Sequence, residues 1–384
     1  MKGFVVYFII LLGIVSLFGD ITYEGARSVT GPYLATLGAS AGVVGLVAGV
    51  GEFVGYALRL ASGHLADRTK AYWLLTFIGY GLLLSIPLLA FTGHWQLAAV
   101  LIILERIGKA IRSPARDTML SYGAKEVGRG WGFAVHEALD QIGAVTGPIF
   151  FSLVFFFHGG YGEGFTLLWI PASLTMVVLA IARKKVPLPQ RLEPPEEAGR
   201  QDIQGKLPRV FWLYTVFTLF SIAGFAHFQI ISYHLKVQSI VPDTQIPLIY
   251  AIAMGVDAVA ALLAGKTYDR AGLMSLLAVP LLAVPIPFLV FSHSYTLVIV
   301  GMALWGAVMG IQETIMRAAI ADLTPVERRG FAYGIFNTAY GASWFLGAAL
   351  MGQLYELSIY YLVLFAVVME LVSIPLLFAV RRAT

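Results

Sequence analysis

Ionisable side chains stand inside long apolar stretches of this 384-residue sequence. A charge at the centre of an apolar helix costs about 2.5–3.5 kcal/mol in a bilayer, so each such residue needs a partner, water or a neutral state. The second half of the chain holds three of them, Asp257, Glu313 and Glu370. The first half holds ten, which are Asp20, Glu24, Arg27, Glu52, Arg59, Glu105, Arg106, Lys109, Glu137 and Asp140. This imbalance places ion coupling, polar substrate contacts, or both, mainly in the first half.

Helical spacing groups several of these residues. Asp20, Glu24 and Arg27 are spaced i, i+4 and i+7, so they share one face of a helix. Arg59 and Glu137 both lie about 10 Å to the cytoplasmic side of mid-membrane, counted at about 1.5 Å per residue. We expect Arg59 and Glu137 to form a structural ion pair. Asp20, Glu24 and Arg27 are expected to take part in function.

Four residues are expected near mid-membrane. Asp20, Glu52 and Asp140 lie at about the same depth as Arg106, counted at about 1.5 Å per residue. One arginine can pair with only some of these carboxylates. A carboxylate left without its own cation is stabilised in its protonated form and can exchange protons, which is the chemistry that proton coupling requires. The alternative is a structural ion-pair network.

The composition indicates a membrane protein. Hydrophobic residues make up 58% of the chain, charged residues make up 12%, and the mean hydropathy is +0.79. Soluble domains contain about 45–50% apolar and about 25% charged residues, so a water-soluble enzyme, a disordered chain and a nucleic-acid-binding domain are excluded. The sequence has no cysteine, which rules out disulfides, thiolate chemistry and cysteine metal sites.

Apolar stretches long enough to cross a bilayer occur throughout the sequence. A spanning helix needs about 20 predominantly apolar residues. No Gly-x-x-x-x-Gly-Lys-Ser/Thr loop occurs, and we expect no cofactor, no resident metal and no soluble domain. The twelve predicted spans are 4–36, 40–65, 71–93, 95–121, 130–157, 165–185, 209–236, 246–267, 273–292, 295–321, 331–355 and 358–380.

The charges in the predicted loops give the orientation. Loop lysines and arginines fall on one side of the membrane, whereas Lys236 is the one possible cation of the opposite loops. By the positive-inside rule the basic side is cytoplasmic. We therefore expect a multi-pass protein of the plasma (inner) membrane with both termini in the cytoplasm. The net charge of +4 reflects this topology and implies no nucleic-acid partner.

One long polar segment divides the chain into halves. It carries Pro187, Pro189, Pro194 and Pro195 on the cytoplasmic side, between the sixth and seventh predicted spans. We predict an N-terminal six-helix bundle over 1–185, a cytoplasmic linker over 186–208 and a C-terminal six-helix bundle over 209–384.

The two halves carry matching residues at a nearly constant offset. Gly63-His-Leu-Ala-Asp67-Arg68 matches Gly265-Lys-Thr-Tyr-Asp269-Arg270 at an offset of 202, and Gly147 matches Gly347 at 200. A constant offset across charged loop residues is stronger evidence than any one match. Parallel halves related by an axis along the membrane normal are a transporter architecture, with the site between the halves.

These motifs resemble the major facilitator superfamily, and the resemblance covers the whole chain. The family signature, Gly-x-x-x-Asp-Arg before a basic residue, stands here as Gly63-His-Leu-Ala-Asp67-Arg68-Thr-Lys70. Gly143-Ala-Val-Thr-Gly147-Pro148 is similar to a motif of the proton-linked antiporters, although larger residues replace the small ones that usually follow it. The resemblance implies an all-α membrane protein with twelve transmembrane helices in two pseudo-symmetric six-helix bundles.

The resemblance also implies roles for these motifs. A conformational latch between the halves would stabilise the outward-open state and break as the halves rock. Its expected residues are Gly63, Asp67, Arg68, Asp269 and Arg270. Glycines four residues apart let two helices approach closely, and a proline within a helix removes a backbone hydrogen bond. The expected helix-packing residues are Gly143, Gly147 and Pro148.

The second half offers polar and aromatic groups in place of charges. His227 and His234 are seven residues apart, which places them on one face of a continuous helix. Asn337, Tyr340 and Trp344 form a stripe that either lines a cavity or packs. The predicted cavity and proton-coupling residues are Asp20, Glu24, Arg27, Glu52, Arg106, Glu137, Asp140, His227, Gln312, Glu313, Asn337 and Tyr340.

These features together predict a secondary active transporter, not an enzyme, that works by alternating access. We expect proton-coupled efflux of a small organic solute or drug. A divalent metal exporter with Asp20, Glu24 and a histidine as ligands is one alternative. An uptake symporter that holds an organic anion at Arg27 or Arg106 is another. The expected partners are a small-molecule substrate, protons or sodium, and the lipid bilayer, for a monomeric protein.

Overall fold

The computed structural model describes residues 2–127, 129–192, 207–324 and 329–383. Every regular element within these ranges is an α-helix or a short 3-10 helix, and none of them is a strand. The all-α prediction is therefore confirmed. Of the predicted linker over 186–208, residues 193–206 lie outside the described residues.

Each predicted span coincides with helical structure. Eight spans are single helices, which are α1 (Lys2–Thr36), α2 (Ala41–Thr69), α4 (Trp95–Val127), α5 (Arg129–Phe156), α10 (Gln245–Ala271), α13 (Tyr295–Leu323), α14 (Arg329–Leu357) and α15 (Ile359–Ala383). The other four are interrupted and consist of α3 (Tyr72–Leu83) with η1 (Pro87–Phe91), α6 (Tyr161–Leu167) with α7 (Trp169–Lys185), α8 (Arg209–Gly224) with α9 (Phe228–Val237), and η3 (Gly272–Leu277) with α11 (Ala278–Ala283) and α12 (Ile286–Val290). A short 3-10 helix, η2 (Pro189–Leu192), follows α7.

Nine helical stretches among the described residues are long and apolar enough to cross a membrane. The longest, Gln245–Val290, has 46 residues, which at about 1.5 Å per residue suffices for two crossings of a hydrocarbon core about 30 Å thick. It covers the eighth and ninth predicted spans and changes direction at Gly272, whose φ of +57° favours glycine. α4 and α14 are not among the nine. In α4 the reason is a set of four charged residues between Glu105 and Arg112.

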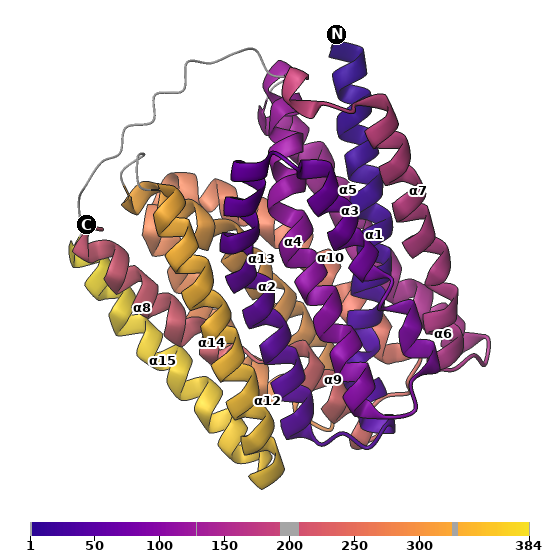
Figure 1. The fold of residues 1–384 in the computed structure, drawn as a ribbon. Helices are drawn as coiled ribbons and strands as arrows, with labels where there is room; N and C mark the ends of the chain where they lie inside the picture. Colours follow the sequence, from indigo (N-terminus) through magenta and orange to yellow (C-terminus); the bar gives the residue numbers. More distant parts are fainter. Residues whose placement is uncertain (1, 128, 193–206, 325–328, 384) are drawn as a thin grey trace. The chain divides into compact units, whose positions relative to one another are not determined.

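The chain divides into two compact units. The first contains Met1–Val29 and Val54–Gly199, and the second contains Thr30–Phe53 and Arg200–Thr384. α1 and α2 therefore contribute residues to both units, whereas the division predicted at the linker assigns residues 30–53 to the first bundle. Within the second unit, α8 lies beside α14 and α15 (Figure 1).

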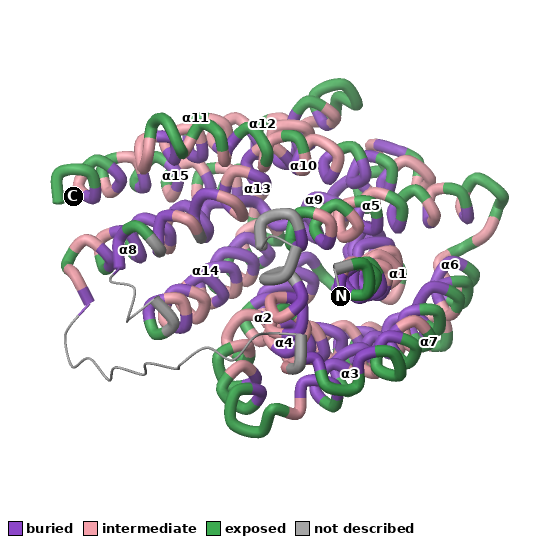
Figure 2. Tube along the Cα trace, turned by 90° about the horizontal axis from the view of Figure 1, so that it is seen from above, coloured by how far each residue is buried: buried purple, intermediate pink, exposed green. Residues whose placement is uncertain are grey.

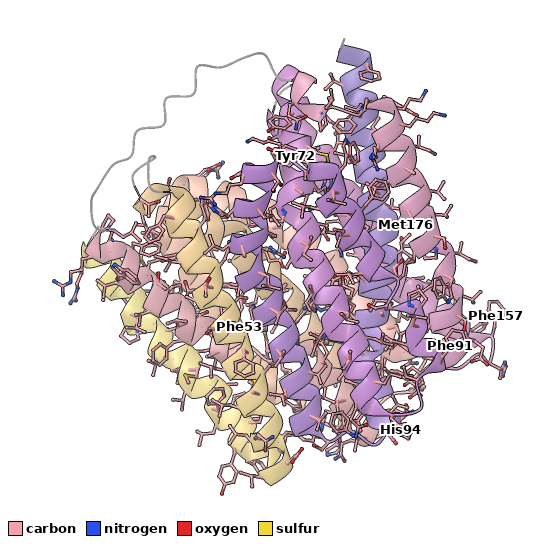
Figure 3. All side chains as sticks on the ribbon, viewed as in Figure 1. Phe53, Tyr72, Phe91, His94, Phe157 and Met176 are labelled. Carbon is pink, nitrogen blue, oxygen red and sulfur yellow. The ribbon has the colours of Figure 1, made fainter. Side chains whose placement is uncertain are left out.

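The exposed sides of the helices are apolar. Along α15, the buried residues Leu362 and Ala366 alternate with exposed ones such as Leu364, and Figure 2 shows buried and exposed positions alternating along this helix. In the first unit, the exposed rings of Phe91 and Phe157 lie near α6 (Figure 3). A helix of a soluble protein exposes polar residues on that side, so these surfaces fit lipid.

Two pairs of helices meet at equivalent glycines. A Cβ on Gly147 of α5 would come within 2.6 Å of the carbonyl oxygen of Ile21 on α1. A Cβ on Gly347 of α14 would come within 2.6 Å of the carbonyl oxygen of Ala223 on α8. Gly147 and Gly347 are the glycines that the internal repeat matches, so the same close backbone approach occurs within each unit.

Span seven is interrupted near its middle. Phe225 is extended, and α9 begins after His227. The indole N–H of Trp305 donates to the carbonyl oxygen of Ala226 at 2.8 Å, which satisfies a backbone group that the break leaves outside a helix. The prediction that His227 and His234 share one face of a continuous helix is therefore wrong, because His227 lies outside α9.

Candidate functional site

Asp20 of α1 and Asp140 of α5 lie close together in the first unit. A Cβ on Gly143, one turn after Asp140, would come within 3.0 Å of the Cβ of Asp20, and the two carboxylates act on each other electrostatically. Two cations of α4, Lys109 and Arg116, act on both carboxylates. Like charges at short range favour a shared proton, and nearby cations oppose it. Arg116 is also ion-paired with Asp117, its neighbour on α4, at 2.9 Å, so three carboxylates lie near these two cations. We call Asp20, Lys109, Arg116 and Asp140 the charge cluster.

The hydroxyl of Ser16 joins four helices beside the charge cluster. Its Oγ accepts a hydrogen bond from Arg116 Nη1 at 2.8 Å and lies 2.9 Å from His136 Nε2. The hydroxyl of Tyr80 on α3 is 3.3 Å away. The other ring nitrogen of His136 is 3.6 Å from Asp140 Oδ2. These contacts fix the ring of His136 and the guanidinium of Arg116 against the cluster, and the sequence analysis did not anticipate them.

Two cations of α4 lie over one aromatic ring. The guanidinium of Arg106 is 4.6 Å from the ring centroid of Tyr23, and the ammonium of Lys109 is 4.0 Å from it. The charge of Lys109 acts on Asp20. The sequence analysis expected Arg106 to compensate the mid-membrane carboxylates, and Lys109 is a further cation beside Asp20.

The neighbouring acidic residues have separate surroundings. Glu24 Oε1 is 3.5 Å from Arg27 Nη1, one turn along α1, and both side chains are buried. The charge of Glu24 also acts on Asp20. Glu52 is buried too, but it belongs to the segment of α2 in the second unit.

α4 contains an ion pair between Glu105 and Arg112 that has a structural role. Arg112 Nη2 donates to Glu105 Oε1 at 3.0 Å, and both side chains are almost fully buried. Arg112 also donates to the carbonyl oxygen of Gly79 at 3.3 Å and lies over the ring of Tyr80 at 4.8 Å. Through Gly79 and Tyr80, Arg112 joins α4 to α3, while Glu105 compensates its charge within α4.

The predicted pair between Arg59 and Glu137 is wrong for the part of the chain described. The guanidinium of Arg59 lies 4.8 Å from the ring centroid of Tyr56, its own neighbour on α2. Glu137 is exposed, and its charge acts on Asp140. Glu137 therefore lies at the edge of the charge cluster.

Apart from Glu313, the predicted residues of the second unit are polar or aromatic side chains. Gln312 is 1% exposed, and its amide makes no hydrogen bond to any described residue. The ring of His227 is 5.0 Å from that of Trp344, and Tyr340 lies 6.3 Å from Trp344 on the same helix. The stripe on α14 is thus packed aromatic core at these positions. The remaining predicted residues, Glu313 and Asn337, are partly exposed.

The expected latch residues lie near the C-terminal ends of two helices, α2 and α10. Asp67 and Arg68 lie exposed in the last turn of α2, and Asp269 and Arg270 lie exposed in the last turn of α10. The chain turns directly after α2, at Lys70 with φ of +53°. The remaining latch residue, Gly63, lies one turn earlier on α2, where a Cβ would only touch Pro114 at 3.6 Å.

Among the residues that the structure describes, no group of three or more histidine, aspartate, glutamate or cysteine side chains is placed to hold a metal ion. Asp20 and Glu24, proposed as metal ligands in one alternative, are instead held beside Lys109 and Arg27. Divalent metal export therefore has no geometric support in the described part of the chain.

An all-helical chain with apolar outer surfaces, an internal repeat and buried charges in its first unit has the features of a secondary transporter. The chain belongs to the Major Facilitator Superfamily, whose family model matches residues 4–348 and 241–384. It is a membrane transporter of this family and not an enzyme.

Relatives cover nearly all of the chain. An uncharacterized protein of Mycobacterium tuberculosis is 41% identical over 379 residues, which is 97% of this chain and 93% of that protein. An uncharacterized MFS-type transporter of Methanocaldococcus jannaschii is 25% identical over 376 residues, which is 94% of this chain and 92% of that protein.

Solved structures share the fold. The nucleoside transporter NupG has a TM-score of 0.73 at 15% identity and 98% coverage of both chains. A bacterial homolog of the human lysosomal transporter Spinster, in an inward-facing and unoccupied conformation, has a TM-score of 0.75 at 14% identity, with coverage of 100% of this chain and 98% of that one. At these identities the likeness defines the fold and not the substrate.

Proposed function

We propose that this transporter is a proton-coupled exporter of a small organic solute, and that Asp20 and Asp140 hold the coupled proton. The observation that carries the proposal is the charge cluster, in which these two carboxylates share Lys109 and Arg116. Protonation of one carboxylate relieves the repulsion between them, and nearby cations stabilise the pair once the proton leaves. A carboxylate pair with these neighbours is the kind of group that proton coupling requires.

Export is the proposed direction because of the helix contact beside the cluster. Gly143 and Gly147 bring α5 against α1 next to Asp20, and this segment resembles the motif of proton-linked antiporters. A helix contact at the proton site gives a route by which protonation changes how the two helices pack. We place the protein in the plasma (inner) membrane as a monomer with both termini cytoplasmic.

The test uses purified protein in liposomes that contain a pH-sensitive dye. A panel of organic cations and neutral solutes is added under an imposed proton gradient, an imposed sodium gradient, or no gradient. The proposal expects at least one solute to move protons in the opposite direction, and expects the sodium gradient to have no effect. Solute transport that follows the sodium gradient and ignores a protonophore would contradict it.

We also propose that Asp67 and Arg68 act as the latch. Asp67→Asn is expected to shift the resting population toward the inward-open state and to slow transport. The absence of cysteine makes single-cysteine labelling on both membrane faces a clean readout. Identical labelling of Asp67→Asn and the parent would exclude the latch, whereas Asp243→Asn, at a partly exposed carboxylate paired with Lys236, serves as the control.

A further inference from the structure

A carboxyl group of the second unit lies apart from the charge cluster. Glu370 is eleven residues after the first residue of α15 and thirteen before its last. At about 1.5 Å per residue it therefore lies about 16–20 Å from either end, near the middle of a hydrocarbon core about 30 Å thick. Its side chain is 1% exposed, so it faces the interior of the unit and not lipid.

α8 and α15 touch at this position. A Cβ on Gly224, the last residue of α8, would come within 3.2 Å of the backbone nitrogen of Glu370 and 3.0 Å of the carbonyl oxygen of Ala366. Ser221, one turn earlier on α8, is fully buried and is the polar neighbour of the Glu370 side chain. The hydroxyl of Ser373 is already used, because it donates to the backbone carbonyl of Glu370 at 2.7 Å.

Among the described residues, neither carboxyl oxygen of Glu370 has a hydrogen-bond partner. The elements packed against α15 are α8, α14, η3, α11 and α12. η3, α11 and α12 contain no titratable side chain. None of the described titratable side chains of α8 and α14 exerts its charge on Glu370, and these are Arg209, Tyr214, Tyr333, Tyr340, Tyr355 and Glu356.

The titratable groups near this region are engaged elsewhere. Tyr214 donates to the carbonyl oxygen of Met316, and Glu356 accepts a hydrogen bond from the backbone N–H of Gly42. A carboxylate buried without a cation, and with the Ser221 hydroxyl as its one polar neighbour from α8, costs several kcal/mol, whereas the neutral acid avoids most of that cost. The geometry therefore favours the neutral form of Glu370 in this conformation.

We propose that Glu370 is a second proton-binding site of this transporter, and that its bound proton holds the end of α8 against α15. The interruption of span seven begins directly after Gly224, so α8 can move without carrying α9 with it. Movement of α8 away from α15 admits water, and the proton then leaves to give a solvated carboxylate. Because the proton binds one arrangement of α8 and not the other, proton binding and the position of α8 are thermodynamically linked.

The proposal is independent of coupling at Asp20 and Asp140, and its first test is spectroscopic. Infrared spectra of the protein in lipid, recorded while the pH is raised, report the carbonyl band of protonated carboxylic acids. Glu370→Gln should remove one component that persists to alkaline pH, and Glu370→Asp should shift that component. Asp20→Asn is the matched control and should retain it. Unchanged spectra of Glu370→Gln would overturn the proposal.

The second test measures the consequence for α8. The unfolded chain releases this proton near the ordinary value for glutamate, about pH 4.3, whereas the folded protein keeps it to higher pH. The thermal midpoint of the parent should therefore fall as the pH rises above about 4.3 and level off once folded Glu370 is deprotonated. Glu370→Gln keeps the size of the side chain but cannot titrate. Its thermal midpoint should therefore lack the part of the pH dependence that comes from Glu370. Asp20→Asn should keep it. Parallel curves for the parent and Glu370→Gln would contradict the linkage, whatever the outcome for proton transport.

Discussion

The two units are stabilised by different interactions. In the first unit, contacts between helices use charged side chains, such as Arg112 with the carbonyl oxygen of Gly79 and Arg116 with Ser16. In the second, aromatic donors satisfy backbone carbonyls, as Trp305 does for Ala226. Buried charges therefore concentrate in the unit where oppositely charged side chains lie close together. The second unit is held together mainly by aromatic side chains.

The buried charges of the first unit make one of its helices unusually polar. α4 carries four charged residues between Glu105 and Arg112 and is too polar to be recognised as a span by its composition. Its charges are tolerated because α1, α3 and α5 supply partners. α15, by contrast, is among the apolar spans and has one carboxyl group, Glu370, with no described cation beside it.

The largest effect is expected for Arg112→Ala. It leaves Glu105 buried at 1% exposure without its cation, and the loss of one partner of a buried pair costs about 3–5 kcal/mol. Thermal unfolding of the purified protein would show this as a large fall in the midpoint. A double change, Arg112→Met with Glu105→Leu, should recover most of the loss. A single variant as stable as the parent would mean that Arg112 does not join α4 to α3.

A smaller and equal effect is expected for Gly147→Ala and Gly347→Ala. Each added methyl would meet a carbonyl oxygen at 2.6 Å, and overpacking of this kind costs about 1–3 kcal/mol. These two variants test what the units share, because a close approach of two helix backbones occurs in both units, whereas a cluster of buried charges occurs in the first. Gly255→Ala is the control, since a Cβ there would meet nothing within 4 Å. Destabilisation by only one of the two changes would break the internal symmetry.

The smallest effect is expected for Trp305→Phe. The ring still packs against Phe225 and Phe228, but the hydrogen bond to the carbonyl of Ala226 is lost, at about 1 kcal/mol. Chemical or thermal unfolding of the two proteins measures the difference. If Trp305→Phe costs as much as Arg112→Ala, the second unit depends on polar contacts as strongly as the first.

Much of the fold could be predicted from sequence because hydropathy reports the transfer of each segment into lipid. Each of the predicted spans coincides with helical structure, including 95–121, where α4 carries four charged residues between Glu105 and Arg112. The interruption of span seven was not predicted, because Gly224 is the one helix-weakening residue there and Phe225, Ala226 and His227 have no helix-breaking character. What permits the break is a donor from a distant helix, Trp305.

The site was predictable only in part, for a similar reason. Spacing along one helix identified Asp20 and Asp140 as mid-membrane carboxylates, because depth follows from residue count. Which side chains of two helices meet depends on how each helix is rotated about its own axis, and residue spacing does not give that rotation. The rotation of α1, α4 and α5 places Lys109 beside Asp20 and Ser16 beside His136.

The central claim is that the charge cluster binds the coupled proton, and one measurement addresses it directly. In the same liposomes, pH-driven solute transport and solute counterflow without a gradient are compared for the parent, Asp20→Asn and Asp140→Asn, with Asp243→Asn as a control. We predict that counterflow persists in both variants, while pH-driven transport falls to the level of empty liposomes in at least one. Full pH-driven transport in both variants would contradict the claim and leave these carboxylates with a structural role.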